Sequence, residues 1–314
     1  MAPSLLRAAL LAVLVAAALR RSALVLPLPA LEPAGRPPPS SLPAPPSPLA
    51  GAWAPNMALR RAERLFQGAF QGAESAAAAA NGSLYILDRY AHIWAAHPRP
   101  ATSGSAAKSG AAGAATDVVY ELAPAPVGYV GPGRPLGFAF DAAGRLVICN
   151  SLTGLLRWTP PAGGAPAEQR VLANAAGGAP VAYANDLDID AANGDVYFSD
   201  AGAIPPALNR AGFYDTMYAY LLNVLQARPR GRLLAWRAAT GRVDVLVSGV
   251  WFANGVALAA DGASVLVVET VGMRVLRRWL RGEQAAVQEL PGGADAEAAG
   301  RELEAGRLLG GGAA

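Results

Sequence analysis

The sequence predicts an all-β protein built as a six-bladed β-propeller, of which about four blades are present, with one helix inserted near residues 215–227. Three observations carry this prediction. Four stretches repeat one strand–turn–strand pattern, a glycine lies in each turn, and three of the four stretches open on an acid or amide. The stretches begin at Glu74, Leu136, Asn185 and Asn254. Repetition of one small β unit along a chain is typical of propeller blades.

Each stretch centres on a dipeptide suited to a tight turn between antiparallel strands. The dipeptides are Asn81-Gly82, Ala143-Gly144, Asn193-Gly194 and Asp261-Gly262. Glycine, asparagine and aspartate adopt the positive φ angles that two-residue hairpin turns require. We therefore expect a hairpin in every blade. Further strands are expected at 231–237 and 243–247, around Thr240-Gly241, and at 274–280.

A helical pattern interrupts the third blade. Met217, Tyr220, Leu221, Val224 and Leu225 fall at helical spacing. Asp215 is placed to cap the amino end, and Pro229 stops the helix. Two interpretations remain open at this stage: a lid over a pocket, or a packing helix that shields blade edges.

The chain divides into four parts by composition. Residues 1–25 are predicted to be a signal peptide or signal-anchor, because an uncharged apolar run from Ala8 to Leu19 precedes Arg20-Arg21 and is shorter than the roughly 20 residues of a spanning helix. An organelle transit peptide is an alternative, since no acid occurs before Glu32; a disordered end without targeting function is another. Residues 26–70 form a Pro/Ala-rich linker, 71–292 the partial propeller, and 293–314 a low-complexity tail. A low-complexity insert of Ala, Gly and Ser covers 101–116.

Charge and cysteine content exclude some classes of protein. The formal net charge is +3, but residues 1–73 carry +5, which leaves the remainder at −2. A body close to neutral argues against a nucleic-acid partner. Cys149 is the one cysteine, so no intrachain disulfide can form, and we interpret it as a buried apolar residue on a strand.

Glu74, Asn185 and Asn254 open three blades, so one site on the propeller axis could collect them. Asp186 and Asp188 follow directly after Asn185 and are candidates for supporting residues or a general base. Asn81-Gly82-Ser83 is an N-glycosylation sequence at an expected hairpin turn, which gives weak support for a lumenal location.

Several motifs in order resemble the strictosidine synthase-like proteins, a family of six-bladed propellers that includes adipocyte plasma membrane-associated protein. The resemblance runs from about Gly72 to Asp295. The matching segments are Gly133-Arg-Pro-Leu-Gly-Phe, Thr153-Gly-Leu-Leu, Asn185-Asp-Leu-Asp-Ile-Asp, Val196-Tyr-Phe-Ser-Asp, Gly231-Arg-Leu-Leu, Phe252-Ala-Asn-Gly-Val-Ala-Leu, Val268-Glu-Thr and Arg278-Trp-Leu-Arg-Gly.

The resemblance implies an axial metal ion, usually calcium, as in the wider superfamily of paraoxonases and gluconolactonases. Its ligands there are a Glu from the first blade, Asn residues from middle blades and an Asp from a later blade. Glu74, Asn185 and Asn254 fit the first three positions, and Asp295 in Leu290-Pro-Gly-Gly-Ala-Asp295 fits the fourth, with Ala296 where Asn is usual. Calcium takes carboxylate and amide oxygens, so the chemistry of this set agrees with the resemblance.

The activity implied by the resemblance is calcium-dependent hydrolysis of an ester or lactone, or a strictosidine synthase-type reaction of an amine with an aldehyde. Leu136 stands where the paraoxonases carry a His, and the late blade that holds the strictosidine synthase Glu is not expected in this sequence. A non-catalytic binding propeller and an inactive product of a truncated gene model are therefore the alternatives. We expect an endoplasmic reticulum or secretory location, lumenal or membrane-tethered through the N-terminus.

Overall fold

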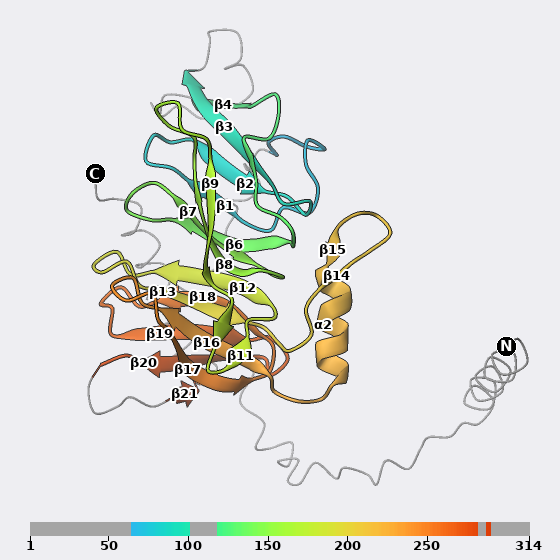
Figure 1. The fold of residues 1–314 in the computed structure, drawn as a ribbon, viewed down its shortest axis with the longest axis vertical. Helices are drawn as coiled ribbons and strands as arrows, with labels where there is room; N and C mark the ends of the chain where they lie inside the picture. The colour runs from blue at the N-terminus through green and yellow to red at the C-terminus, as the bar shows by residue number, and fades with distance from the viewer. Residues whose placement is uncertain (1–63, 101–117, 282–286, 290–314) are drawn as a thin grey trace, which may run out of the picture. The chain divides into compact units, whose positions relative to one another are not determined.

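The computed structural model describes residues 64–100, 118–281 and 287–289, about half of which form antiparallel strands (Figure 1). The expected leader, most of the Pro/Ala-rich linker, the 101–116 insert and the low-complexity tail lie outside the described residues. Within the described ranges, no helix has the length and apolar character needed to cross a membrane.

Four sheets follow one another along the chain, each with four strands in sequence order. The first two sheets are β1-β2-β3-β4, with β5 paired to β3, and β6-β7-β8-β9. Their bounds are β1 Ala76–Ala78, β2 Leu84–Leu87, β3 His92–Pro100, β4 Val118–Leu122, β5 Gly128–Tyr129, β6 Pro135–Phe140, β7 Leu146–Asn150, β8 Gly154–Thr159 and β9 Glu168–Ala173.

The third and fourth sheets are β12-β13-β16-β17 and β18-β19-β20-β21. Two short ribbons, β10-β11 and β14-β15, lie outside these sheets. The bounds are β10 Ala175–Ala176, β11 Ala179–Pro180, β12 Ala184–Ile189, β13 Val196–Asp200, β14 Ala207–Leu208, β15 Tyr214–Asp215, β16 Gly231–Trp236, β17 Val243–Val250, β18 Ala253–Leu258, β19 Ser264–Glu269, β20 Arg274–Trp279 and β21 Val287–Glu289.

The first strands of the sheets lie next to one another: β12 contacts both β6 and β18, and β6 contacts β1. The second strands β7 and β13 are buried at every position because each sheet packs between neighbours. Apolar clusters fill these spaces; one joins Val147 and Leu155 of the second sheet to Leu187 and Phe198 of the third. The expected all-β fold with four blades is confirmed.

The expected hairpin turns join the first two strands of each blade. In the first blade, Gly82 has a φ of 80° and its N–H donates to the carbonyl of Ala79. A side chain at this φ would be strained, which explains why glycine follows the turn residue Asn81.

The expected helix is present as α2, Thr216–Leu225, between β15 and β16. The Asp215 carboxylate accepts a hydrogen bond of 2.9 Å from the N–H of Tyr218, as expected of an N-cap. The buried residues of α2 are Thr216, Ala219 and Asn223, whereas the apolar residues that predicted it are largely exposed. The helix is thus correctly predicted, but only part of its apolar stripe packs inward: Tyr220 contacts Phe252, whereas Met217, Leu221 and Leu225 are exposed.

A buried polar residue ends the second strand of every blade: Asp88 directly after β2, then Asn150, Asp200 and Glu269. In three blades a basic residue in the first two positions of the third strand contacts this acid, in the pairs Asp88–His92, Asp200–Arg232 and Glu269–Arg274. In the second blade the partner position is Gly154, and the acid is replaced by the neutral Asn150. The second blade therefore lacks both the acidic residue and its basic partner.

Candidate functional site

A β-bulge interrupts the first strand of three blades at the same place. Two residues of the first strand face one of the second: Leu136 and Gly137 opposite Cys149, Asn185 and Asp186 opposite Ser199, and Asn254 and Gly255 opposite Val268. Bulges re-aim side chains and are frequent beside active sites. The structure thus makes Leu136, Asn185 and Asn254 equivalent, as their sequence positions predict.

The second bulge residues bring the three blades together around one carboxylate. A Cβ atom added to Gly137 would lie 2.2 Å from Oδ1 of Asp186, and one added to Gly255 would lie 3.8 Å from Oδ2. The carboxylate of Asp186 therefore occupies space that Gly137 leaves open, and it lies at ordinary contact distance from Gly255. The sequence analysis gave neither glycine a role, although Gly137 directly follows Leu136 and Gly255 directly follows Asn254.

Asp186 and Asp188 both bind the backbone of the fourth blade. Oδ2 of Asp186 accepts a hydrogen bond of 2.9 Å from the N–H of Val256, and Oδ2 of Asp188 accepts one of 2.8 Å from the N–H of Leu258. These bonds join β12 to β18 side by side. Asp188 thus holds two blades together.

The Asn185 side chain is the unusual polar group of the site. The residue is 5% exposed, and no hydrogen bond from its amide to another described residue is found. Its amide atoms are nevertheless not among the fully enclosed polar atoms that lack a partner. The equivalent Asn254 is half-buried and likewise has no recorded partner within the described ranges.

Glu74 comes from the segment ahead of β1, so it is not in a bulge as Asn185 and Asn254 are. Its side chain is about half exposed, and Oε2 lies 3.6 Å from a guanidinium nitrogen of Arg134. Burial raises the pKa of Glu74; Arg134 opposes this shift, and the negative charge of Asp186 adds to it. Two carboxylates that disfavour each other's charge are a suitable place for a cation.

Arg134 links this region to α2, and sequence reasoning did not find it. Its Nη1 donates a hydrogen bond of 2.7 Å to Oγ1 of Thr216, and its Nη2 donates one of 3.2 Å to the carbonyl of Gly72. The hydroxyl of Tyr183 also donates to the carbonyl of Thr216, at 3.0 Å. Leu136, Tyr183, Ala219 and Phe252 form one buried apolar cluster. The first turn of α2 therefore packs beside the bulges.

The residues present fit a hard divalent cation by donor chemistry. Glu74 and Asp186 supply carboxylate oxygens, and Asn185 and Asn254 supply amide oxygens, which are the donors that calcium takes in proteins. Among the described residues there is no group of three or more His, Cys, Asp or Glu side chains placed to hold a metal ion. Any ion here would thus depend on the two amides.

The remaining assigned residues lie elsewhere. Asp295 lies outside the described residues. Asn81 is exposed in the turn between β1 and β2, and its Oδ1 accepts a hydrogen bond of 3.0 Å from the N–H of Ser83. Cys149 is fully buried on β7, as expected, and burial raises the pKa of its thiol, with Asp186 and Asp200 adding to the shift.

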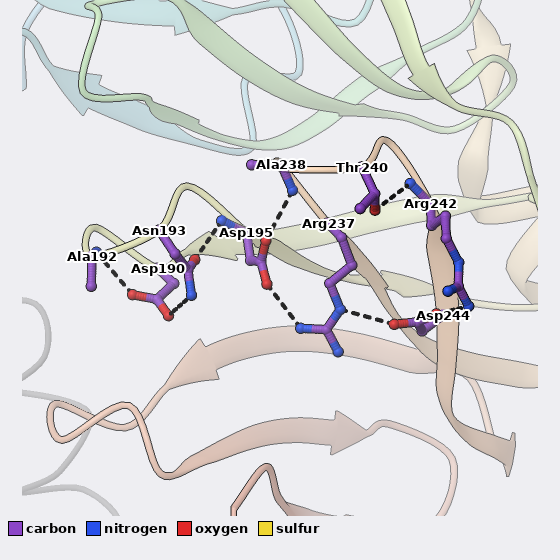
Figure 2. Close-up of polar contacts among 9 residues, drawn as sticks. All are labelled: Asp190, Ala192, Asn193, Asp195, Arg237, Ala238, Thr240, Arg242 and Asp244. Atoms are coloured by element: carbon purple, nitrogen blue, oxygen red, sulfur yellow. Dashed lines mark hydrogen bonds and ion pairs between the residues drawn. The ribbon is translucent and has the colours of Figure 1, made fainter.

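A concavity of about 270 Å³ lies at the carboxyl end of β12, and Asp190, Asp195 and Arg237 are among the residues that line it. Figure 2 shows why we do not assign it as the site: the carboxylate of Asp195 binds Arg237, and Arg237 also binds Asp244, each at 2.9 Å. Asp190 is held by the N–H of Ala192 and the amide of Asn193. These charges are already paired within the turns that they stabilise.

Comparison with known proteins finds two matching family profiles. The strictosidine synthase family profile matches residues 185–283, and the profile of the strictosidine synthase-like N-terminal region matches 51–86. The first match contains both amide-bearing bulges and the helix between them.

The chain is similar to the strictosidine synthase-like family over these residues.

Members of this family from plants and animals are similar to the chain over part of its length. Strictosidine synthase-like protein 10 of Arabidopsis thaliana is 39% identical over 165 residues, covering 51% of this chain and 40% of the relative. The adipocyte plasma membrane-associated protein of Salmo salar is 29% identical over 241 residues, covering 73% and 50%. The chain thus spans about half or less of the length of these relatives.

Solved structures similar to this chain include a gluconolactonase from Xanthomonas campestris. The identity is 15% and the TM-score 0.45, with 70% of this chain and 63% of the other covered.

Proposed function

We propose that this protein binds calcium at the inner bulges and hydrolyses a small-molecule ester or lactone there. The observation that carries the proposal is that Asn185 and Asn254 occupy equivalent bulges of two blades, with the 5% exposed Asn185 next to the carboxylate of Asp186. Glu74, Asn185, Asn254 and Asp186 would hold the ion. Bound calcium would supply charge that polarises the substrate carbonyl.

The chain's own residues would position the substrate and the ion. Asp186 is fixed by the N–H of Val256, so its carboxylate is oriented before any ligand arrives. Arg134 is held by Thr216 and Gly72 beside Glu74, where it would orient an oxygen of the substrate. Of Asp186 and Asp188, Asp186 is the candidate general base. Both carboxylate oxygens of Asp188 already accept backbone hydrogen bonds, from the N–H groups of Leu258 and Ile189.

A second function, binding without catalysis, is favoured by Leu136. This residue occupies the bulge of the second blade, is 2% exposed and packs with Tyr183 and Phe252, so no titratable group lies at that position. Under this alternative the ion would be structural, or the site would bind an amine, aldehyde, ester or lactone without turnover.

Calcium titration by calorimetry tests the ion site. Asn185→Leu is a matched variant, because the second blade already holds a leucine at the equivalent bulge position. We expect Asn185→Leu to fold and to lose calcium binding, Asn185→Asp to retain it, and Asn81→Gln, in a distant turn, to leave it unchanged. Calcium affinity equal in wild type and Asn185→Leu would remove the proposed site.

Hydrolysis of aryl esters and lactones separates the two functions. Turnover that EDTA abolishes and calcium restores supports the hydrolase. Calcium binding with no turnover on any of these substrates supports the binding protein instead.

A secretory or membrane-associated location belongs to the same proposal, because relatives include adipocyte plasma membrane-associated proteins. Asn81 is exposed in its turn and accessible to a glycan. Expression of the full chain in eukaryotic cells should give a glycosidase-sensitive mass increase that Asn81→Gln abolishes; an unmodified wild-type chain would contradict a lumenal location.

A further inference from the structure

The helix α2 carries apolar residues on the side that faces away from the protein as well as on the side that packs against it. The side that meets the protein carries Thr216, Ala219 and Asn223, all buried. The amide of Asn223 donates to the carbonyls of Ile204 and Ala219 and accepts from the N–H of Ile204. Hydrogen bonds thus fix this side, together with the contact of Tyr220 on Phe252, whose ring centroids are 4.7 Å apart.

The opposite side of α2 is apolar and exposed. Met217, Leu221 and Leu225 lie four residues apart on one line and are 65%, 50% and 78% exposed, and Tyr218 beside them is 56% exposed. Leu208 on β14 of the same insertion is 61% exposed. Helices in water normally place such side chains toward the core. Figure 1 shows α2, in gold, to one side of the sheets.

The charged residues near α2 in the chain are mostly basic. The segment 201–231 contains Arg210, Arg228 and Arg230, all exposed, and one acid, Asp215, whose carboxylate caps the helix. No residue of α2 itself is charged. An exposed apolar stripe on a segment whose exposed charges are arginines matches the interfacial region of an anionic bilayer, where apolar side chains enter the acyl boundary and basic groups meet lipid phosphates.

We propose that the exposed side of α2, formed by Met217, Tyr218, Leu221 and Leu225, is a membrane-docking surface for anionic phospholipid. This contact is separate from the tether expected at the N-terminus and does not depend on the proposed calcium site. The hydrogen bonds of Thr216, Asn223 and Asp215 hold the helix in place, so the surface is formed before the membrane is met.

A fluorophore at position 225 tests the proposal in the full chain. Leu225→Cys is labelled with an environment-sensitive dye; the buried Cys149 stays unreactive. Met273→Cys, at a position 90% exposed and on another blade, is the matched control. Vesicles of phosphatidylcholine with phosphatidylserine should shift the emission of the dye at 225 to shorter wavelength and protect it from iodide, and should leave the dye at 273 unchanged.

Two further double variants test the apolar and the electrostatic parts of the membrane contact separately. Leu221→Ser with Leu225→Ser should weaken insertion on the order of tenfold, since apolar burial drives it. Arg228→Gln with Arg230→Gln should weaken binding to anionic vesicles by roughly tenfold or more and leave binding to pure phosphatidylcholine unchanged.

Three outcomes would overturn the proposal. The protein could sediment with vesicles while the dye at 225 stays in water, which would assign binding to the N-terminus alone. The emission could shift with protein concentration in the absence of vesicles, which would make the surface an interface between copies. Equal insertion into neutral and anionic vesicles would remove the role of the arginines.

Discussion

Asp186 shows how one side chain can set the geometry around it. Its carboxylate accepts from the N–H of Val256 on the fourth blade and lies against Gly137 of the second. The glycine at 137 is required by space, because an added Cβ would also lie 2.8 Å from the Cα of Asp186.

Gly137→Ala should therefore lower the free energy of unfolding by about 1–3 kcal/mol, the usual range for overpacking. Gly255→Ala is the control, since its added Cβ meets the Val268 side chain at 3.3 Å, a contact that a small shift relieves. Urea denaturation measures both; equal losses in the two variants would contradict the close fit of Asp186 against Gly137.

Glu74 predicts a pH dependence of ion binding. Burial and Asp186 raise its pKa above the ordinary value of 4.5, so the carboxyl takes up a proton at higher pH in the folded protein than in the unfolded chain. In the absence of a cation, Glu74 then lowers stability as the pH rises through the interval between these two pKa values.

Calcium requires the deprotonated carboxylate, so calcium affinity should fall as the pH is lowered through the raised pKa of Glu74. Calorimetric titrations across the acidic range measure this change. Glu74→Gln should bind more weakly at neutral pH and lose most of the dependence; an unchanged pH profile in that variant would exclude Glu74 as a ligand.

At the scale of elements, the acid–base pairs at the strand ends hold the loops that enter each blade. The Asp200 carboxylate accepts from the N–H groups of Ala182 and Tyr183 ahead of β12 and from Arg232 on β16. The pair is almost fully buried, and burial raises the pKa of Asp200 although Arg232 opposes the shift. Removing one partner of such a pair leaves an uncompensated charge.

Asp200→Asn should cost about 3–5 kcal/mol of stability, because it keeps the shape but leaves Arg232 without its counter-charge. Asp200→Asn with Arg232→Ala should cost less than Asp200→Asn alone, since the second blade already combines Asn150 with the uncharged Gly154. A double-mutant cycle by thermal or urea unfolding gives the coupling; additive losses would show that the two residues act independently.

At the scale of the molecule, the proposed ion would connect three blades through Glu74, Asn185 and Asn254. A ligand that binds only the folded state stabilises it by about 2.7 kcal/mol at a free concentration 100 times its dissociation constant. Calcium should thus raise the melting temperature of the wild type, and EDTA should reverse the rise. Asn185→Leu should show no rise; a rise of the same size in that variant would place the ion elsewhere.

Local sequence patterns predicted most of the elements correctly. Asn81-Gly82 marks a real hairpin because a tight turn needs a positive φ at glycine, and Asp215 caps α2 because its side chain reaches the N–H of Tyr218. The sequence also predicted that Asn185 and Asn254 are equivalent, and each is the second residue of the first strand of its blade. These features depend on residues close together in the chain, so the sequence contains the information directly.

The sequence by itself determined the all-β blade pattern, the helix near 215–227 and the candidate set of Glu74, Asn185 and Asn254. Only the tertiary structure decided that Asp186 lies between two glycines of other blades, that Arg134 reaches Glu74 and Thr216, and that part of the apolar stripe of α2 faces outward. The physical reason is range: periodicity and turn chemistry act over a few residues, whereas these contacts join segments far apart in the chain. Helical spacing shows that Met217, Leu221 and Leu225 share one side of a helix, but the surrounding sheets decide which side is buried.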